Sequence, residues 1–275
     1  KAVQHHIVLL HTADAERMKS AVIAGTTLLP RDRTSTHSMD TLPPATRKLH
    51  HLMTANVTSG PGAIPCWKLL APFLPSLALV DRLVFLDSDM LFLQDPHSLW
   101  TSFDDFSSPH LIGAALNHDG IVGFNSGVLL LELSRMRGER SEWMHALQTG
   151  VRALRQSNVR LGWLADQTFL SYLAGYEFFN PSQKLFRIED APLYGKIWTL
   201  SCGWNRQLSY HAANEPNFWP HWAACTEPCR LAHFSGVFFK PLLAVFARPP
   251  QRNNLTRDRC SRIVLRHMQS REREW

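Results

Sequence analysis

Two aspartates separated by one residue directly follow an apolar run in the segment Phe85-Leu86-Asp87-Ser88-Asp89-Met90. Burying carboxylates beside apolar residues is unfavourable unless a cation or a hydrogen-bond donor accompanies them. If the chain stays extended there, the alternation of side chains places Asp87 and Asp89 on the same side. Their hard oxygen atoms suit Mg²⁺ or Mn²⁺ bridging to phosphate, which predicts a bound metal diphosphate. The alternative is that both are solvated turn or cap residues after a strand.

Two further segments combine small or polar residues with a regular element. In Gly123-Phe124-Asn125-Ser126-Gly127 a polar pair opens an apolar run, which would bring amide and backbone groups close to a sugar or a phosphate. The alternative there is a simple turn before a core strand. In Leu164-Ala165-Asp166-Gln167 a carboxylate and an amide stand at the start of a helix, where Asp166 faces a ligand, caps the helix or does both.

An imidazole and an ammonium group lie in the segment from His233 to Pro241. His233 is a candidate for completing a metal site, and Lys240 is a candidate for binding phosphate. The alternative for His233 is a histidine of the core whose hydrogen bonds are satisfied, because it stands among apolar residues.

Hydrophobic periodicity predicts the elements that must position these residues. Strand-length apolar runs occur at residues 7–10, 82–86, 111–116 and 124–133. Helical spacing occurs at residues 18–28, 67–74, 141–154 and 166–173. Residues 31–44, rich in Arg, Ser, Thr and Pro, are expected to form an exposed loop without a strand. Strands that alternate with helices predict an α/β domain with a mostly parallel sheet, and the sequence after Gly175 is expected to be irregular.

The composition is that of a folded globular chain of 275 residues, 45% of them hydrophobic. It contains no window of about 18 to 20 uninterrupted apolar residues that would span a membrane. The formal charge of +6 is spread along the chain except for a basic tail at residues 252–273, which favours a phosphorylated small molecule over nucleic acid. Because the sequence begins at Lys1 without a signal core, any targeting segment or membrane anchor is expected outside it.

The cysteines and the glycosylation sequons indicate an oxidising compartment. Disulfides are the preferred interpretation of the cysteines over a structural zinc at Cys225 and Cys229, which lack a second pair of ligands at zinc-finger spacing. Sequons begin at Asn56 and Asn254. Together these features predict a protein of the secretory pathway lumen. The five cysteines are Cys66, Cys202, Cys225, Cys229 and Cys260.

The order of these motifs resembles the retaining nucleotide-sugar transferases of glycosyltransferase family 8, over about residues 67–241. The segments 82–93, 124–128 and 202–207 look closest to the glucoside and xyloside xylosyltransferase branch, and residues 18–23 match its first helix more weakly. The resemblance implies a GT-A fold with a Rossmann-like, mostly parallel central sheet, flanking helices and an irregular C-terminal part.

The same resemblance implies one catalytic domain over residues 1–275. Its expected divisions are a nucleotide-binding half at 1–133, an acceptor-side half at 134–250 and a basic tail at 251–275. It also implies three sets of site residues. The ligands of Mn²⁺ or Mg²⁺ would be Asp87, Asp89 and His233. The UDP-sugar donor would contact Thr12 and Ala13 at the uridine, Gly236 and Lys240 at the diphosphate, and Asp87, Ser88, Asn125 and Ser126 elsewhere. The catalytic residues beside the transferred sugar would be Asp166 and Gln167.

Three departures from the family pattern matter for these assignments. Lys240 stands four residues after Gly236, whereas the family motif His-x-x-Gly-x-x-Lys has three. Thr168 replaces the acidic residue that usually follows Asp-Gln in the related branch. Residues 31–51 show no second apolar strand, so the nucleotide-binding half is expected to be abbreviated and donor affinity to be reduced or absent.

The resemblance implies transfer of xylose or a hexose from a UDP-sugar to a glycan or glycoprotein hydroxyl, in the Golgi or endoplasmic reticulum. The chain would be part of a type II membrane protein or of a secreted precursor. Asp166 is the only matched carboxylate expected to reach the anomeric centre, and Gln167 is a poor nucleophile. Same-face attack is therefore favoured, with the leaving phosphate taking the acceptor's proton. One alternative is a Mg²⁺-dependent phosphohydrolase of the haloacid dehalogenase type, whose motif usually has Thr or Val where Leu91 stands. The other is an inactive, transferase-like secreted binding module.

Overall fold

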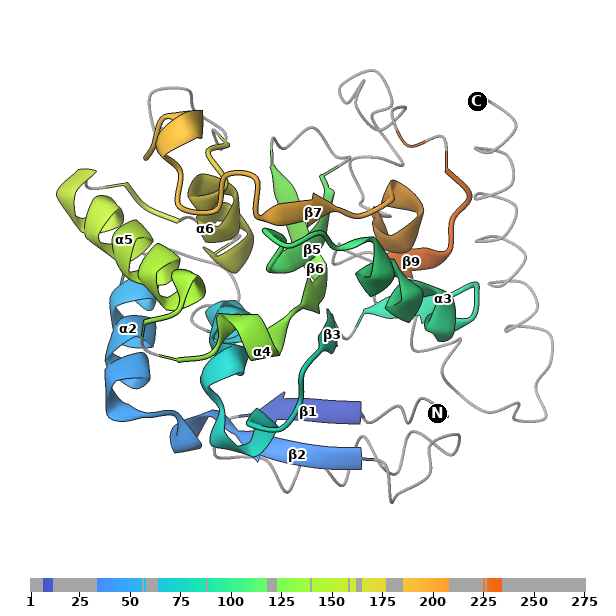
Figure 1. Cartoon of the computed structure of the whole chain (residues 1–275), viewed down its shortest axis with the longest axis horizontal. Coiled ribbons are helices and arrows are strands. Elements are labelled where there is room, and N and C mark those ends of the chain that lie inside the picture. Colours follow the sequence, from blue (N-terminus) through green and yellow to red (C-terminus); the bar gives the residue numbers. More distant parts are fainter. Residues whose placement is uncertain are drawn as a thin grey trace, which may run out of the picture.

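Figure 1 shows a central mixed sheet lying between two groups of helices in the computed structural model. Among the described residues, no helix has the length and apolar character needed to cross a bilayer. The structure describes residues 7–11, 34–55, 57, 64–87, 89–117, 123–138, 140–157, 159–161, 165–176, 185–207, 225 and 227–233.

The larger sheet has four described strands, which are, in spatial order, β3 (Leu83–Leu86), β6 (Phe124–Leu131), β5 (Ile112–Leu116) and β7 (Ile197–Thr199). β6 pairs antiparallel with both β3 and β5, while β5 and β7 are parallel. All eight residues of β6 are buried, which requires cover on both faces of the sheet. The apolar composition of β6 therefore matches its central place.

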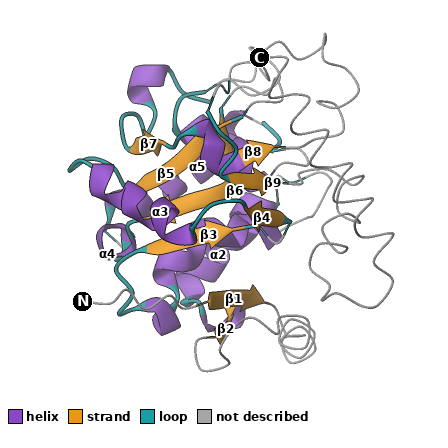
Figure 2. Ribbon diagram, turned by 90° about the vertical axis from the view of Figure 1, so that its right-hand side faces the viewer, coloured by secondary structure: helices purple, strands orange, loops and turns teal. Residues whose placement is uncertain are grey.

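A smaller sheet continues at one end of the larger one, as Figure 2 shows. Its strands are, in spatial order, β4 (Met90–Phe92), β9 (Leu231–His233) and β8 (Arg206–Gln207). β9 runs antiparallel to β4, with His233 opposite Met90, and parallel to β8, with His233 in register with Gln207. A separate parallel pair is formed by β1 (Ile7–His11) and β2 (Thr34–Ser38).

Helices cover both faces of the larger sheet (Figure 1). One face is covered by α2 (Pro44–Thr54), the 3-10 helix η3 (Ile64–Phe73), α4 (Leu133–Met136), α5 (Glu142–Ser157) and α6 (Ala165–Leu173). The other face is covered by α3 (Pro96–Trp100) and the 3-10 helices η5 (Thr101–Asp105) and η9 (Cys202–Asn205). Within the described part of the chain, three single-turn 3-10 helices lie in connections: η2 (Met39–Thr41), η4 (Pro75–Leu77) and η8 (Ile188–Asp190).

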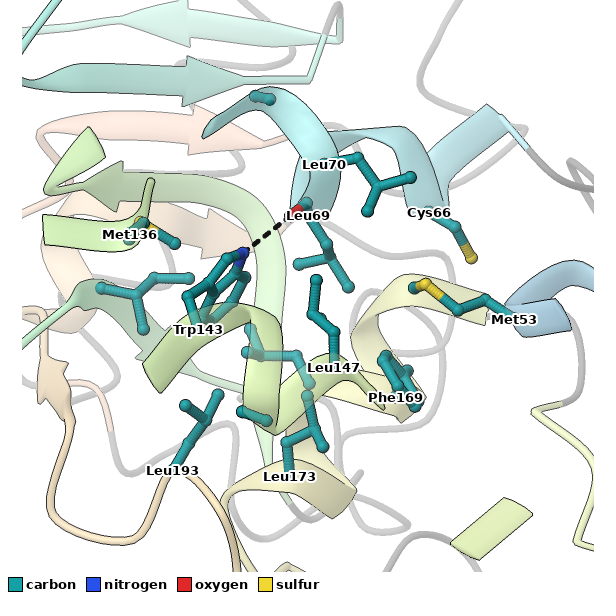
Figure 3. Packing of buried hydrophobic residues seen from close by; sticks show 14 of the residues in the cluster. Met53, Cys66, Leu69, Leu70, Met136, Trp143, Leu147, Phe169, Leu173 and Leu193 are labelled. Atoms are coloured by element: carbon teal, nitrogen blue, oxygen red, sulfur yellow. Dashed lines mark hydrogen bonds between the residues drawn. The ribbon is translucent and has the colours of Figure 1, made fainter. Parts of the chain in front are cut away.

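The described residues form two hydrophobic clusters because neighbouring residues of β6 point to opposite faces of the sheet. Leu129 packs into the larger cluster with α5 and α6, whereas Leu130 packs into the smaller one with η5 and η9. In the larger cluster, shown in Figure 3, the buried Trp143 of α5 donates its indole N–H to the carbonyl of Leu69 at 2.9 Å. This bond ties α5 to η3, the helix that also carries Lys68.

Most of the expected elements are confirmed within one to three residues. The strands expected at 7–10, 82–86, 111–116 and 124–133 are β1, β3, β5 and β6, and the helices expected at 67–74, 141–154 and 166–173 are η3, α5 and α6. The helix expected at 18–28 lies outside the described residues.

Two expectations about the sheets are wrong. The expected loop at 31–44 contains β2, which is polar, and its backbone pairing with β1 defines it as a strand; the abbreviation of the nucleotide-binding half stays a prediction. Because β6 runs antiparallel to both its neighbours, the larger sheet is mixed rather than mostly parallel.

Trp143→Phe tests the tie between α5 and η3. The substitution removes part of the buried ring and leaves the carbonyl of Leu69 without its indole donor, so the free energy of unfolding should fall by about 2–4 kcal/mol. Trp198→Phe, at a half-buried position on β7, is the matched control and should cost less than about 1 kcal/mol. Denaturant unfolding of both variants measures the difference, and equal losses would contradict the assigned role.

Candidate active site

The Asp-x-Asp segment lies where the chain leaves the larger sheet and enters the smaller one. Asp87 follows the last residue of β3, and its backbone N–H donates to the carbonyl of Gly127 on β6 at 2.9 Å. Asp89 precedes β4, whose first residue, Met90, stands opposite His233. Residues far apart in the sequence are therefore brought together by two strand pairings.

The side chains of Asp87, Asp89 and His233 form a three-membered cluster. One ligand atom from each lies within 4.8 Å of the others, and Nε2 of His233 is 3.4 Å from Asp89 Oδ1 and 3.8 Å from Asp87 Oδ2. Asp89 is only 8% exposed and His233 4%, so neither is a freely solvated residue. Two carboxylates and one imidazole are a donor set that suits Mn²⁺ or Mg²⁺.

A buried lysine balances the carboxylates on the other side of this cluster. Lys68 Nζ lies 2.7 Å from Asp87 Oδ1 and 3.3 Å from Asp166 Oδ2, and it donates to the carbonyl of Ser126 at 3.0 Å. Asp87 therefore has one oxygen on Lys68 and the other facing His233. This arrangement joins the expected metal ligands to the expected catalytic carboxylate.

Burial and charge shift the pKa values of this pair in a consistent way. Burial raises the pKa of Asp166, and Lys68 opposes that increase without reversing it. Burial alone would lower the pKa of Lys68, but the charges of Asp166 and Asp87 outweigh it and raise that pKa above its ordinary value. The lysine thus stays protonated beside a carboxylate that holds its proton more tightly than a solvated aspartate does.

An amide cluster places Gln167 next to the polar residues of β6. Asn125 donates from Nδ2 to Gln167 Oε1 at 3.1 Å and to Asn117 Oδ1 at 3.2 Å. Gln167 in turn donates from Nε2 to the same oxygen of Asn117 at 3.2 Å. Asn125 and Gln167 are buried, so these bonds fix both amides at the site.

Gly127 allows the imidazole of His233 to approach the strand closely. A Cβ atom at this position would lie 2.7 Å from Nδ1 of His233 and 2.8 Å from the terminal methyl carbon of Met90. The expected function of the Asn-Ser-Gly segment was close approach to a sugar or a phosphate. The structure adds a different requirement, which is room for His233.

The structure brings together seven of the expected site residues: Asp87, Asp89, Asn125, Ser126, Asp166, Gln167 and His233. Five others lie outside the described residues: Thr12, Ala13, Ser88, Gly236 and Lys240. The alternative of a zinc at Cys225 is wrong, because Cys225 forms a disulfide with Cys202.

Lys68 and Gln207 are among the buried polar residues near the site that sequence reasoning missed. Lys68 stands in the apolar stretch Cys66-Trp67-Lys68-Leu69-Leu70, and a cation there signals a buried partner. Gln207 is fully buried in register with His233, and neither polar atom of its amide has a hydrogen-bond partner among the described residues. Residues in register on paired strands point to the same face, so Gln207 is directed towards the side of the sheet that carries His233.

Comparison with curated proteins finds relatives that match about half of the chain, while no protein-family model matches it. Glucoside xylosyltransferase 1 of Danio rerio is 28% identical over 156 residues, which are 48% of this chain and 34% of that protein. Human xylosyl- and glucuronyltransferase LARGE2 is 30% identical over 167 residues, which are 54% of this chain and 20% of that protein. The chain thus spans about a third or less of the length of these two relatives.

Solved structures resemble the chain over most of its length. Mouse xyloside xylosyltransferase 1 superposes with a TM-score of 0.62 at 19% identity, covering 84% of each chain. The galactosyltransferase LgtC, solved with donor and acceptor sugar analogues, gives a TM-score of 0.51 at 14% identity, covering 90% of this chain and 98% of that one. These neighbours are GT-A glycosyltransferases, so the expected fold class is confirmed.

Gly127→Ala tests the close approach of His233. The added methyl group should push the imidazole away from Asp87 and Asp89, and Mn²⁺ affinity should fall about 10- to 100-fold, as when other supports of a metal ligand are altered. Gly113→Ala is the matched control, because its Cβ would lie 2.8 Å from the ring of Phe106, away from the cluster. Calorimetric titration with Mn²⁺ should show weakened binding in the first variant only.

Lys68→Met tests the balance of charge in the buried pair. Removing the ammonium leaves Asp166 and Asp87 uncompensated, so the free energy of unfolding at neutral pH should fall by about 3–5 kcal/mol. Because burial raises the pKa of Asp166 above its ordinary value, the folded state binds a proton more readily than the unfolded state. As pH rises through the raised pKa, the contribution of Asp166 to stability is therefore lost, and removing Lys68 increases this loss.

The deficit of Lys68→Met should accordingly be larger at pH 8 than at pH 5, as measured by denaturant unfolding at both pH values. Lys48→Met, on the exposed face of α2, is the control and should change stability by less than about 0.5 kcal/mol at either pH. A deficit independent of pH would argue that Lys68 acts through packing alone.

Proposed function

We propose that the chain is the catalytic domain of a metal-dependent, retaining glycosyltransferase that uses a UDP-sugar. The observation that carries the proposal is the convergence of Asp87, Asp89 and His233, with Asp166 joined to Asp87 through Lys68. The GT-A fold and the glycosyltransferase relatives support it.

The chemistry of the donor set fits a divalent cation. Three protein ligand atoms within 4.8 Å of one another leave further coordination positions for phosphate oxygens. The cation would neutralise the negative charge that develops on the departing nucleoside diphosphate. Asp87, Asp89 and His233 would hold it, and the backbone pairings of β3 and β4 would keep their side chains in place.

Asp166 and Gln167 are proposed to orient the transferred sugar. The Asp166 carboxylate is buried and paired with Lys68, which reduces its availability as a nucleophile. The Gln167 amide is already bonded to Asn125 and Asn117. These contacts support attack of the acceptor hydroxyl on the face from which the diphosphate departs, with a phosphate oxygen accepting the proton. No covalent bond to the protein is required.

The proposed donor sugar is xylose or a hexose, and the proposed acceptor is a glycan or glycoprotein hydroxyl. Support for xylose comes from the names of the relatives, a glucoside xylosyltransferase and a xylosyl- and glucuronyltransferase. Gln207 is a further proposed contact for substrate, since both polar atoms of its buried amide are without a partner among the described residues.

The proposed location is the secretory pathway lumen, in the Golgi or endoplasmic reticulum. The Cys202–Cys225 disulfide supports an oxidising compartment, because such bonds are rare in reducing ones. Asn56 and Asn254, at which the sequons begin, lie outside the described residues.

Asp89→Asn tests the proposed function directly. Replacing one anionic ligand by an amide should weaken Mn²⁺ binding and lower Mn²⁺-dependent hydrolysis of the donor about 100-fold or more, with little effect on folding. A panel of UDP-sugars incubated with Mn²⁺ identifies the donor, and UDP release measures the rate. Asp105→Asn, at an exposed position on η5, is the matched control and should retain full activity.

Three results would contradict the proposal. Unchanged hydrolysis in Asp89→Asn would contradict the assignment of Asp89 as a metal ligand. Tight calorimetric binding of a UDP-sugar without hydrolysis or transfer to any acceptor would favour the binding module instead. Release of phosphate from simple phosphomonoesters would favour the phosphohydrolase.

A further inference from the structure

Two buried amides connect His233 to the polar residues of β6. His233 Nδ1 lies 2.9 Å from Oδ1 of Asn205, and Asn205 Nδ2 lies 2.8 Å from Oδ1 of Asn125. Asn205, the last residue of η9, is fully buried. An amide accepts through its oxygen and donates through its nitrogen. Asn205 can therefore bond to both His233 and Asn125 in only one of its two orientations.

A backbone amide determines the orientation of the whole chain of bonds. The N–H of Gly127 is only a donor, and it donates to Asn125 Oδ1 at 2.9 Å. The oxygen of Asn125 must therefore face Gly127, which leaves its Nδ2 to donate to Gln167 Oε1 at 3.1 Å. That same oxygen of Asn125 also faces Asn205.

The orientation of Asn125 determines that of Asn205. Facing the oxygen of Asn125, Asn205 must present its Nδ2, because the reverse orientation would set two acceptor oxygens 2.8 Å apart in a buried place. Its Oδ1 then faces His233. An amide oxygen is only an acceptor, so Nδ1 of His233 must carry a hydrogen.

We propose that Asn205 is a positioning residue that sets the tautomer of His233, with its own orientation set by Gly127 through Asn125. In the neutral ring, a hydrogen on Nδ1 leaves the lone pair on Nε2, the nitrogen that lies 3.4 Å from Asp89 Oδ1 and 3.8 Å from Asp87 Oδ2. All three members of the cluster then direct lone pairs towards one place, which is what a cation requires.

The inference rests on the proposed function only for the cation, since the tautomer itself follows from the hydrogen bonds. The inference also accounts for the position of Asn205 on the helix that the disulfide anchors. Cys202 begins η9 and is bonded to Cys225, so the helix that carries Asn205 is covalently attached to the segment preceding β9 and His233.

Nitrogen NMR of the metal-free protein labelled with ¹⁵N-histidine tests the tautomer. In the neutral form of the ring, the His233 signals should show a protonated Nδ1 and a bare Nε2. Comparison with the spectrum of His233→Gln identifies these signals among those of the 14 histidines. A bare Nδ1 in the wild-type protein would overturn the proposal, and this result needs no variant of Asn205.

Two substitutions of Asn205 then distinguish the role of its side-chain oxygen as a hydrogen-bond acceptor from a role in packing alone. Asn205→Leu removes the acceptor and should lower Mn²⁺ affinity about 10- to 100-fold, the usual range for the outer partner of a metal-bound histidine. Asn205→Asp keeps an oxygen for the Nδ1 hydrogen, so it should retain the tautomer and lose less Mn²⁺ affinity than Asn205→Leu, although its second oxygen replaces the Nδ2 donor that faces Asn125 Oδ1 and should lower the free energy of unfolding. Calorimetry with Mn²⁺ and the same NMR spectra provide both readouts.

The outcomes distinguish this inference from the proposed function. Wild-type Mn²⁺ affinity in Asn205→Leu, or equal losses in the two variants, would overturn the role of the acceptor. Failure of the wild-type protein to bind Mn²⁺ would instead contradict the metal-dependent function, while the tautomer would still be read from the metal-free spectra. If Asn205→Leu does not fold, the wild-type spectrum decides the question.

Discussion

Three carboxylates gathered in a mostly buried space are the constraint on which this site depends. Asp87, Asp89 and Asp166 would repel one another in the absence of positive charge, and their desolvation would add to that cost. Within the described residues, Lys68 is the cation that contacts two of them, Asp87 at 2.7 Å and Asp166 at 3.3 Å. Asp89 lies instead on the side of His233, at 3.4 Å. The arrangement therefore balances one side with a fixed ammonium and leaves the other side suited to a divalent cation.

Asp87 links these two sides because each of its oxygens serves a different partner. One oxygen contacts Lys68, and the other faces His233. A change in the charge near His233 therefore acts on the same carboxylate that Lys68 holds, and through Lys68 on Asp166. The side chain of Asp87 is 32% exposed, so a ligand can reach it from solvent. The side chain of Asp166 is buried, so a ligand can contact it only from within the site. This geometry would couple the proposed cation at Asp87 to the proposed sugar contact at Asp166.

What the sequence predicted well was apolar and local, and what it missed depended on pairing between distant segments. The run at 82–86 and the spacing of Trp143, Leu147 and Val151 predicted β3 and α5, because burial alone determines such patterns. β2 was missed because its residues are polar and its pairing with β1 is a backbone property. The apolar stretch around Lys68 indicates that it has a buried partner, but its partners are 19 and 98 positions away, so no local pattern identifies them.

The site depends most strictly on strand register, since it is assembled from short strands. His233 reaches the carboxylates because it stands opposite Met90, and a slip of one residue would turn it to the other face of the smaller sheet. Three residues of β9 specify such a register weakly by themselves, so contacts outside the strand must contribute. Arg230 donates its backbone N–H to the carbonyl of Gly203 at 2.8 Å, just before β9 begins. With the disulfide at Cys202, this bond aligns η9 and β9, and therefore aligns the imidazole with the amide that orients it.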